Sequence, residues 1–367
     1  MAVPRPPAAY ATAINNSENP VRPLCVGEGP LILGGDVGGT KTWLGLFRAS
    51  GRDANAGLSL LRSAKYPSKS AGSLEQLVGE FLGNELFAVD FACFGLPGPV
   101  RGTRVQLINL PWQVDSDALQ ARFGFGGCFL INDLMANAYG IREIHASDFA
   151  VLHAGSSEAV GNMAVISPGT GLGEAGIYWD GRKHRPFACE GGHCDFAPRT
   201  ELEVELLRYL LASYGHVSFE RVLSGSMGLP NLYCFLRDTG RAPENPGIAA
   251  ALKNGDAGAV ITRAAIDGSC QLCVQTMELF AEILGAEAGN LALKTMATGG
   301  VFIGGGIAAK ILPILQRSQL LEGFFAKGRF TDFMKQIPLR VILNDQAALL
   351  GAARQALHIA EASGSNS

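Results

Sequence analysis

The chain has 367 residues, 47% of them hydrophobic, which is enough for about two domains that each have a core. Its net charge of −3, with acidic and basic residues interspersed, offers no stripe for a nucleic-acid backbone or an anionic membrane surface. The sequence has no run of about 18 apolar residues, so no membrane-spanning helix is predicted. These properties exclude several classes of partner, and we expect a cytoplasmic protein that acts on small molecules.

Glycine is the enriched residue type. Its 47 positions have no collagen-like period and therefore predict many tight turns and close backbone approaches. The eight cysteines are scattered through apolar stretches, which is typical of reduced thiols rather than of a disulfide framework. Residues 1–28 are rich in Pro, Ala and Asn, and residues 362–367 are small and polar, so both segments are expected to be flexible tails.

The first half of the sequence predicts a three-stranded meander that leads into alternating strands and helices. Its first helix starts at a capping box, Ser73-Leu74-Glu75-Gln76, which can satisfy free amides of the first turn. In chain order, the predicted elements are strands 31–36, 41–48 and 58–66, helix 73–82, strand 87–94, helix 117–122, strand 128–132 and helix 134–144. We therefore expect a small N-terminal domain, residues 29–145, with a mixed sheet flanked by helices.

The second half starts with a similar glycine-turned hairpin, which indicates a duplicated domain. Its predicted elements are strands 163–167 and 175–179, helices 201–214 and 261–294, strands 300–303 and 340–343, and helix 346–360. A larger α/β domain over residues 146–361 is expected, with a ligand cleft between the two domains.

The first glycine loop, residues 35–40, joins two predicted strands. It is not a Walker P-loop, because Thr40 stands where that motif needs lysine and a strand follows instead of a helix. Gly38 and Gly39 would let backbone amides approach phosphate oxygens, with the Thr40 hydroxyl as a donor and Asp36 near a metal ion. The alternative is a simple hairpin turn.

The second loop contains the spacing G-x-G-x-x-G at Gly171, Gly173 and Gly176. A dinucleotide fingerprint of this kind must open a helix, but the following residues predict a strand and a turn, which disfavours a dehydrogenase. Two such hairpins, one in each half, would instead hold one phosphate chain from both sides.

Asn132 and Asp133 stand where a buried strand ends and a helix begins, a usual position for ligand-facing groups. A kinase that acts on a hydroxyl group needs a carboxylate to accept the proton, and Asp133 is the candidate. Asp133 could equally be an ordinary helix N-cap.

The segment from Glu190 to Asp195 places a carboxylate and the His193 imidazole in a glycine-containing loop. Sugar hydroxyls suit these groups, because hydroxyls both donate and accept hydrogen bonds. A zinc site through Cys189, His193, Cys194 and Asp195 is the alternative, but adjacent Cys194 and Asp195 make poor ligand spacing. Glu220 could bind sugar or form a salt bridge with Arg221.

Together these segments resemble the bacterial-type glucokinase family within the actin-like sugar kinases, over about residues 31–358. The ordered set is specific, although each motif alone is weak. It comprises residues 35–40, Leu96-Pro97-Gly98-Pro99, Asn109-Leu110-Pro111-Trp112, Ile131-Asn132-Asp133, Gly169-Thr170-Gly171-Leu172-Gly173, Glu190-Gly191-Gly192-His193 with Asp195-Phe196-Ala197-Pro198, Glu220-Arg221-Val222-Leu223-Ser224-Gly225, Gly289-Asn290-Leu291-Ala292 and 300–307.

The resemblance implies duplicated actin-like, ribonuclease H-like domains and an ATP-dependent kinase that makes glucose 6-phosphate for glycolysis. It implies that Asp133 is the general base toward the glucose 6-hydroxyl. The implied sugar-binding residues are Asn132, Asp133, Glu190, His193 and Glu220. The implied ATP-binding residues are Asp36, Gly38, Gly39, Thr40, Thr170, Gly171, Gly304, Gly305 and Gly306. Mg²⁺ would arrive with ATP, no metal bound by the protein alone is predicted, and we expect a homodimer.

Two departures from the family pattern stand out. Lys41 occupies a position where many relatives have Asn, so its contact with phosphate stays open. The chain also lacks the C-x-C-G motif of the zinc-carrying branch, which favours the branch without zinc.

A sugar-sensing regulator on the same fold would need a DNA-binding module, which residues 1–28 do not predict. An actin-like ATPase would have no reason for Glu190, His193 and Glu220.

Overall fold

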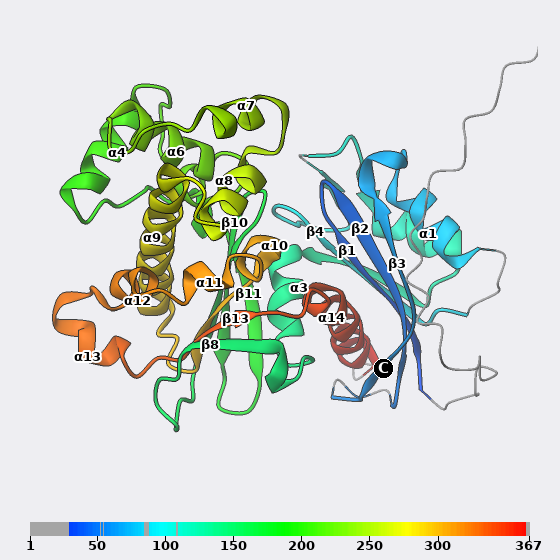
Figure 1. The fold of residues 1–367 in the computed structure, drawn as a ribbon. Helices are drawn as coiled ribbons and strands as arrows, with labels where there is room; N and C mark the ends of the chain where they lie inside the picture. The colour runs from blue at the N-terminus through cyan, green and yellow to red at the C-terminus, as the bar shows by residue number, and fades with distance from the viewer. Residues whose placement is uncertain (1–28, 52, 54, 84–87, 108, 365–367) are drawn as a thin grey trace, which may run out of the picture. The chain divides into compact units, whose positions relative to one another are not determined.

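The computed structural model describes residues 29–364 except 52, 54, 84–87 and 108 (Figure 1). The expected tail of residues 1–28 lies outside this part, as does residue 87, the start of one predicted strand. Of the second expected tail, residues 362–364 are helical instead and residues 365–367 lie outside the described part. The described residues divide into two compact units, unit 1 within residues 1–143 and 346–367 and unit 2 within residues 144–345. Among the described helices, none combines the length and the apolar character that a membrane crossing requires.

Unit 1 is built on a five-stranded mixed sheet in the order β3-β2-β1-β4-β7. The central strand, β1, is almost wholly buried, which explains its nearly continuous apolar sequence. The meander β1-β2-β3 is antiparallel, whereas β4 and β7 run parallel to β1. The strands are β1 Leu31–Val37, β2 Lys41–Ala49, β3 Leu58–Pro67, β4 Phe91–Leu96 and β7 Gly127–Asn132, and a separate ribbon joins β5 Arg104–Gln106 to β6 Gln113–Asp115.

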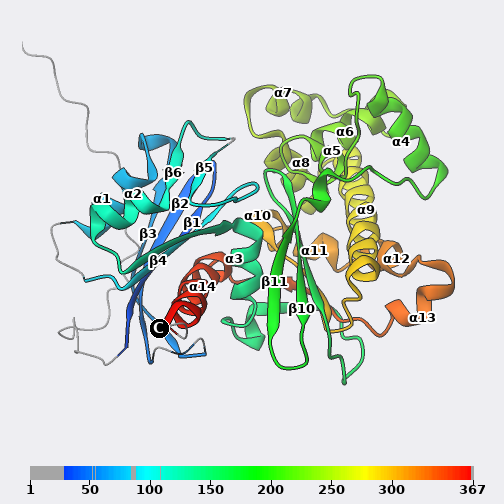
Figure 2. The same cartoon turned by 180° about the vertical axis from the view of Figure 1, so that it is seen from behind.

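Helices cover both faces of this sheet, because alternate residues of each strand point to opposite sides. Leu33 belongs to the core cluster that contains α1, whereas its neighbour Ile32 belongs to the cluster that contains α14. The two views agree that α1 and α2 lie on one face and that α3 and α14 lie on the other (Figures 1 and 2). The helices are η1 Ser68–Ser70, α1 Leu74–Leu82, α2 Ser116–Phe123, α3 Asp133–Gly140 and α14 Ala347–Gly364.

Unit 2 repeats this strand order and adds one strand, giving β11-β10-β9-β12-β13-β8. Here β10 and β11 complete the antiparallel meander, and β12 and β13 run parallel to β9. The strands are β8 Phe149–His153, β9 Met163–Pro168, β10 Leu172–Trp179, β11 His184–Cys189, β12 Gly300–Ile303 and β13 Leu339–Ile342. The shared order confirms the predicted duplicated α/β fold with mixed sheets.

Helices of unit 2 gather around α9, a 25-residue helix. It is buried along most of its length, and a hydrophobic surface all round is what such a position requires. The helices are η2 Ala146–Asp148, η3 Gly191–His193, α4 Glu201–Leu211, α5 Glu220–Leu223, α6 Gly228–Asp238, α7 Pro246–Asn254, α8 Ala257–Ile266, α9 Gln271–Thr295, α10 Gly305–Ala308, α11 Leu312–Leu315, α12 Ser318–Phe325, η4 Gly328–Phe330 and α13 Thr331–Met334.

Several elements differ from the sequence prediction. The predicted helix 261–294 is two helices, because Gly268 adopts a positive φ of 66° between them. The helix predicted to reach residue 144 ends at Gly140. Strand β11 was not predicted, since its half-exposed residues include Pro186 and lack a clear alternation.

The C-terminal helix α14 belongs to unit 1, whereas the sequence placed residues 346–361 in the second domain. It crosses α3 at two glycines whose absent side chains let the backbones meet. A Cβ atom at Gly140 would overlap the Ala347 carbonyl, and one at Gly351 would overlap the Ala136 carbonyl. Beyond the crossing, the Arg354 guanidinium donates to both carboxylate oxygens of Glu143, at 2.8 and 2.6 Å.

We expect Gly351→Ala to lower the melting temperature by roughly 3–10 °C, since overpacking costs about 1–3 kcal/mol. A helix interior is normally more stable with alanine than with glycine. A lower melting temperature would therefore come from the clash with Ala136. Differential scanning calorimetry measures it, with Gly215→Ala as the control because a Cβ atom at Gly215 meets no atom within 4 Å. A melting temperature of Gly351→Ala at or above that of the wild type would contradict the crossing.

Candidate active site

The β1–β2 hairpin of unit 1, predicted to hold phosphate, is pinned by Ser68. The Gly38 amide donates to the Lys41 carbonyl at 2.9 Å. Ser68 is buried, its hydroxyl donates to the Gly38 carbonyl at 2.6 Å, and its amide donates to the Thr40 carbonyl at 3.0 Å. These bonds fix the turn from one side. The sequence pattern had not identified Ser68, because it lies 28 residues beyond Thr40 in the chain.

Asn132, and not Asp133, caps helix α3. The Asn132 Oδ1 atom accepts from the amides of Leu134 and Met135 at 2.9 and 3.2 Å, and its Nδ2 donates to the Gly98 carbonyl at 3.1 Å. Asp133 is the first helical residue. The interpretation of Asp133 as an ordinary N-cap is therefore wrong, because its neighbour has that role.

Asp36 and Asp133 are brought to one edge of the unit 1 sheet. Strands β1, β4 and β7 are parallel neighbours, so their carboxyl ends share this edge. Asp36 pairs in register with Gly95, and Leu96 pairs with Asn132, so Asp36 and the end of β7, which precedes Asp133, lie two strands apart, or roughly 10 Å. Asp133 is half-buried at the first turn of α3, where the helix dipole favours negative charge.

The second predicted phosphate loop of unit 2 follows β9 and is tied to the turn after α5. The Gly169 amide donates to the Gly171 carbonyl, and the Gly225 amide donates to the Gly169 carbonyl, both at 2.8 Å. The Ser226 hydroxyl donates to the Thr170 carbonyl at 2.6 Å. The Thr170 residue itself is exposed. Ser226 is a further residue that the motif did not reveal.

The glycines after β12 lie against the end of β9, beside this loop. The Gly304 amide donates to the Ile166 carbonyl at 2.8 Å and extends the parallel ladder. Gly305 has a φ of 85°, and a Cβ atom there would be 2.5 Å from the Pro168 carbonyl oxygen. Gly306 follows in α10, and a Cβ atom there would meet nothing within 4 Å. The structure thus brings together the segments predicted to bind phosphate and adenosine in unit 2.

The segment from Glu190 to Asp195, which is predicted to bind sugar and is called the sugar loop, packs on the first residues of β10. A Cβ atom at Gly192 would overlap the Leu172 carbonyl, so only glycine allows this approach. Leu172 in turn donates its amide to Glu220 Oε2 at 3.1 Å. Glu190 and His193 flank the contact and are exposed. Sugar-loop residues and Glu220 therefore meet at the start of one strand.

Two alternative interpretations of this region were a salt bridge between Glu220 and Arg221 and a zinc site that includes His193 and Asp195. Glu220 bonds the Leu172 amide, while its neighbour Arg221 lies over the Tyr214 ring, 4.4 Å from its centroid. Asp195 pairs with His216, whose Nε2 lies 2.7 Å from Asp195 Oδ1. Within the described part of the chain, no group of three or more His, Cys, Asp or Glu side chains is arranged to hold a metal ion.

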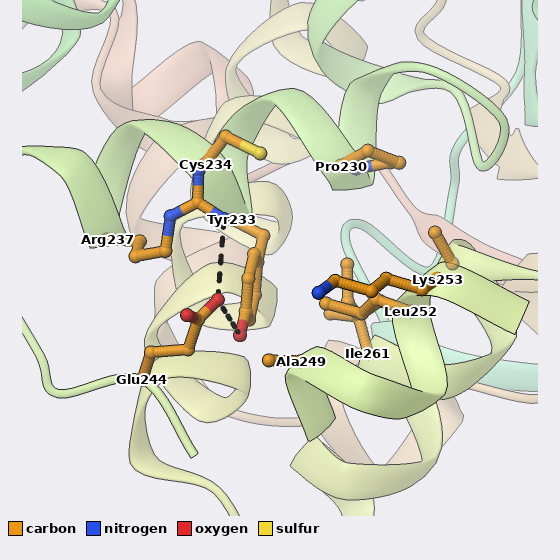
Figure 3. Close-up of a pocket in the computed structure, with 10 residues that line it drawn as sticks. Pro230, Tyr233, Cys234, Arg237, Glu244, Ala249, Leu252, Lys253 and Ile261 are labelled. Carbon is orange, nitrogen blue, oxygen red and sulfur yellow. Dashed lines mark hydrogen bonds and ion pairs between the residues drawn. The ribbon is translucent and has the colours of Figure 1, made fainter. Parts of the chain in front are cut away.

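A separate cavity of about 340 Å³ lies between α6, α7 and α8 (Figure 3). Glu244 accepts hydrogen bonds there from the Tyr233 hydroxyl and from Arg237 Nη1, both at 3.3 Å, and Lys253 lies on the opposite side. The residues that line it are Pro230, Tyr233, Cys234, Arg237, Glu244, Ala249, Leu252, Lys253, Ala257 and Ile261. This set includes none of the predicted sugar or nucleotide residues.

Comparison with known proteins gives the same assignment as the motifs. The glucokinase family model matches residues 33–359. A glucokinase of Nostoc punctiforme is 41% identical over 337 residues, which cover 88% of this chain and 98% of that protein. The crystal structure of a glucokinase from an Antarctic psychrotroph has a TM-score of 0.76 and 31% identity, and covers 89% of this chain and 99% of that chain.

A ROK family glucokinase from Streptomyces griseus, solved with glucose and AMPPNP, has a TM-score of 0.59 over 89% of this chain and 99% of its own. Its identity of 22% supports the shared fold alone. The family match spans most of the chain, and it agrees with the duplicated sheets and with the grouping of motifs in each unit. The chain belongs to the glucokinase family of ATP-dependent hexose kinases.

Proposed function

We propose that this protein transfers the terminal phosphoryl group of ATP to the 6-hydroxyl of D-glucose, and that the glucose 6-phosphate enters glycolysis. The observation that carries this proposal is the position of Asp133 beside its capping neighbour Asn132, at the edge where Asp36 and the phosphate hairpin also lie. The similarity to glucokinases at 41% and 31% identity supports glucose as the acceptor, and membership of a family of ATP-dependent kinases supports ATP as the donor. A cytoplasmic homodimer is part of the same proposal.

Asp133 is the proposed general base. It accepts the proton of the 6-hydroxyl as that oxygen attacks phosphorus, a role worth about 10²–10⁴ in rate. Phosphoryl transfer otherwise depends on positioning and on neutralising charge. Asp36 offers the carboxylate oxygen that Mg²⁺ prefers, beside the β1–β2 hairpin. The Gly38 amide closes that turn on the Lys41 carbonyl, so Gly39 and Thr40 are the proposed donors to phosphate. Mg²⁺ bound with ATP would supply charge neutralisation.

Asn132, Glu190, His193 and Glu220 are the proposed sugar-binding residues. Asn132 Oδ1 is engaged with two helix amides and one Nδ2 hydrogen with Gly98, so one amide hydrogen is left for a sugar hydroxyl. Glu220 binds the Leu172 amide through Oε2, which leaves Oε1 for sugar. The exposed Glu190 carboxylate can accept hydrogen bonds from sugar hydroxyl groups, and the exposed His193 imidazole can both donate to them and accept from them.

The proposal as a whole is tested by a coupled assay with ATP and Mg²⁺ across glucose, mannose, fructose and N-acetylmannosamine. The largest kcat/KM is expected for glucose. ADP and polyphosphate serve as alternative donors in the same assay. A larger kcat/KM for another sugar would redirect the proposal, because the same set of polar side chains can hold other hydroxyl patterns.

Asp133→Asn should lower kcat by about 10²–10⁴, because asparagine keeps the shape of the side chain but accepts no proton at neutral pH. Glucose binding, measured by isothermal titration calorimetry, should persist. Turnover within a few-fold of the wild type would remove Asp133 from the mechanism.

Two asparagine caps give a matched pair. Asn132→Ala and Asn245→Ala each remove an Oδ1 atom that accepts from two helix amides, and each should cost about 0.5–2 kcal/mol of stability. Only Asn132→Ala should also raise the KM for glucose, since Asn245 caps α7, a helix that carries none of the proposed sugar-binding residues. Steady-state kinetics and thermal melts separate the two effects. Equal KM values would show that Asn132 is only a cap.

A further inference from the structure

Strand β10 carries a glutamate in its buried interior. Glu174 is 1% exposed and pairs in register with Cys189, the last residue before the predicted sugar loop. A Cβ atom at Gly191 would overlap Glu174 Oε2, so the carboxyl group fills the space directly behind that glycine. No described residue donates a hydrogen bond to Glu174 Oε1. The sugar loop therefore packs on a buried carboxyl group.

The neighbouring carboxyl group of Glu287 is also fully buried, but each of its oxygens accepts a hydrogen bond. Its Oε1 accepts from Lys294 Nζ at 3.1 Å, and its Oε2 accepts from Asn290 Nδ2 at 2.8 Å. The Lys327 ammonium donates to Asn290 Oδ1 at 2.6 Å. This arrangement supplies a donor to each oxygen of Glu287. It leaves Glu174 beside a negative charge, where two carboxyl groups can share a hydrogen bond only if one is protonated.

Burial, followed by the charge of Glu287, raises the pKa of Glu174 to about 8. Lys294 opposes this shift. Glu174 is therefore uncharged at neutral pH. It acquires a negative charge as the pH rises through 8. Because a buried charge without a partner is unfavourable, this ionisation destabilises the packing around Glu174.

Other titratable groups face the same region. Burial raises the pKa of the Cys189 thiol, with a further contribution from Glu174. Burial and the charge of Arg199 lower the pKa of Lys327 to about 8. Cys194 and Glu190 lie on the loop itself, and the Cys194 residue is exposed. Lys327 is thus the second group that titrates in the window of Glu174, and any test must separate the two.

We propose that Glu174 is a positioning residue for sugar binding: its uncharged carboxyl group supports the loop at Gly191, and its ionisation in alkaline solution displaces the loop. The inference rests on the proposed function, in which Glu190 and His193 bind glucose. The loop is the side of the contact that yields, because its outer residues are exposed whereas α9 behind Glu174 is buried. Its opening would give the new carboxylate access to water.

The test is the dissociation constant of glucose at pH 7 and pH 9, from isothermal titration calorimetry without nucleotide. If only protein with neutral Glu174 binds well, a pKa of about 8 makes the constant rise about tenfold over this interval. Glu174→Gln should give a constant that stays within about twofold, because the amide keeps the neutral shape at both pH values. Lys327 is intact in this variant, so an alkaline rise that persists would belong to Lys327 or another group and would overturn the inference.

Two further variants keep the test decisive. Glu174→Met, neutral and of similar length, should also give a flat profile, and it replaces Glu174→Gln if that variant melts below the wild type. Glu203→Gln changes another glutamate that is 1% exposed but is paired with Arg199, and it should keep the tenfold rise. A folded Glu174→Gln that binds glucose weakly at both pH values also contradicts the role. A wild type that neither binds nor phosphorylates glucose at pH 7 would sink the proposed function itself, which is a distinct result.

Discussion

Backbone segments from distant parts of unit 2 meet at points where no side chain would fit, and glycine occupies each point. The start of β10 meets the sugar loop at Gly192, and the end of β9 meets Gly305. Contacts of this kind join main chain to main chain, so the residues on either side are held by the rigid sheet rather than by flexible side chains. The polar groups that flank these glycines acquire fixed positions as a result, and much of the chain's enrichment in glycine has this origin.

The repeated sheet explains how the polar groups are shared between the units. In each unit, a meander and two parallel strands bring their loops to one edge. Unit 1 carries Asp36, the capped helix α3 and one glycine hairpin at its edge, whereas unit 2 carries the second hairpin, the sugar loop and the glycines after β12 at its own edge. The same architecture therefore presents different side chains, and the chemistry lies in the loops rather than in the sheets.

Three carboxyl groups show how environment assigns a role to one kind of side chain. Asp133, the proposed base, lies half-buried in the first turn of a helix, where the helix dipole favours negative charge. Glu220 is tied to a backbone amide and retains one oxygen for a ligand. Glu174 is buried beside Glu287, which favours its neutral form and suits it for packing rather than for binding.

The sequence by itself determined the α/β class, the duplication, the two hairpins and most strands, because these depend on local periodicity, glycine turns and motif order. The predicted N-cap at Ser73 formed, with its hydroxyl accepting from the Gln76 amide, but the Gln76 side chain accepts from the Gly72 amide, so the reciprocal bond of a capping box is replaced. Only the tertiary structure decided that Asn132 caps α3, that α14 packs in unit 1 and that Glu220 bonds Leu172. It alone placed Glu174 behind Gly191. Each of these depends on the exact direction of a side chain or on contacts between residues far apart in the chain, which short-range patterns do not encode.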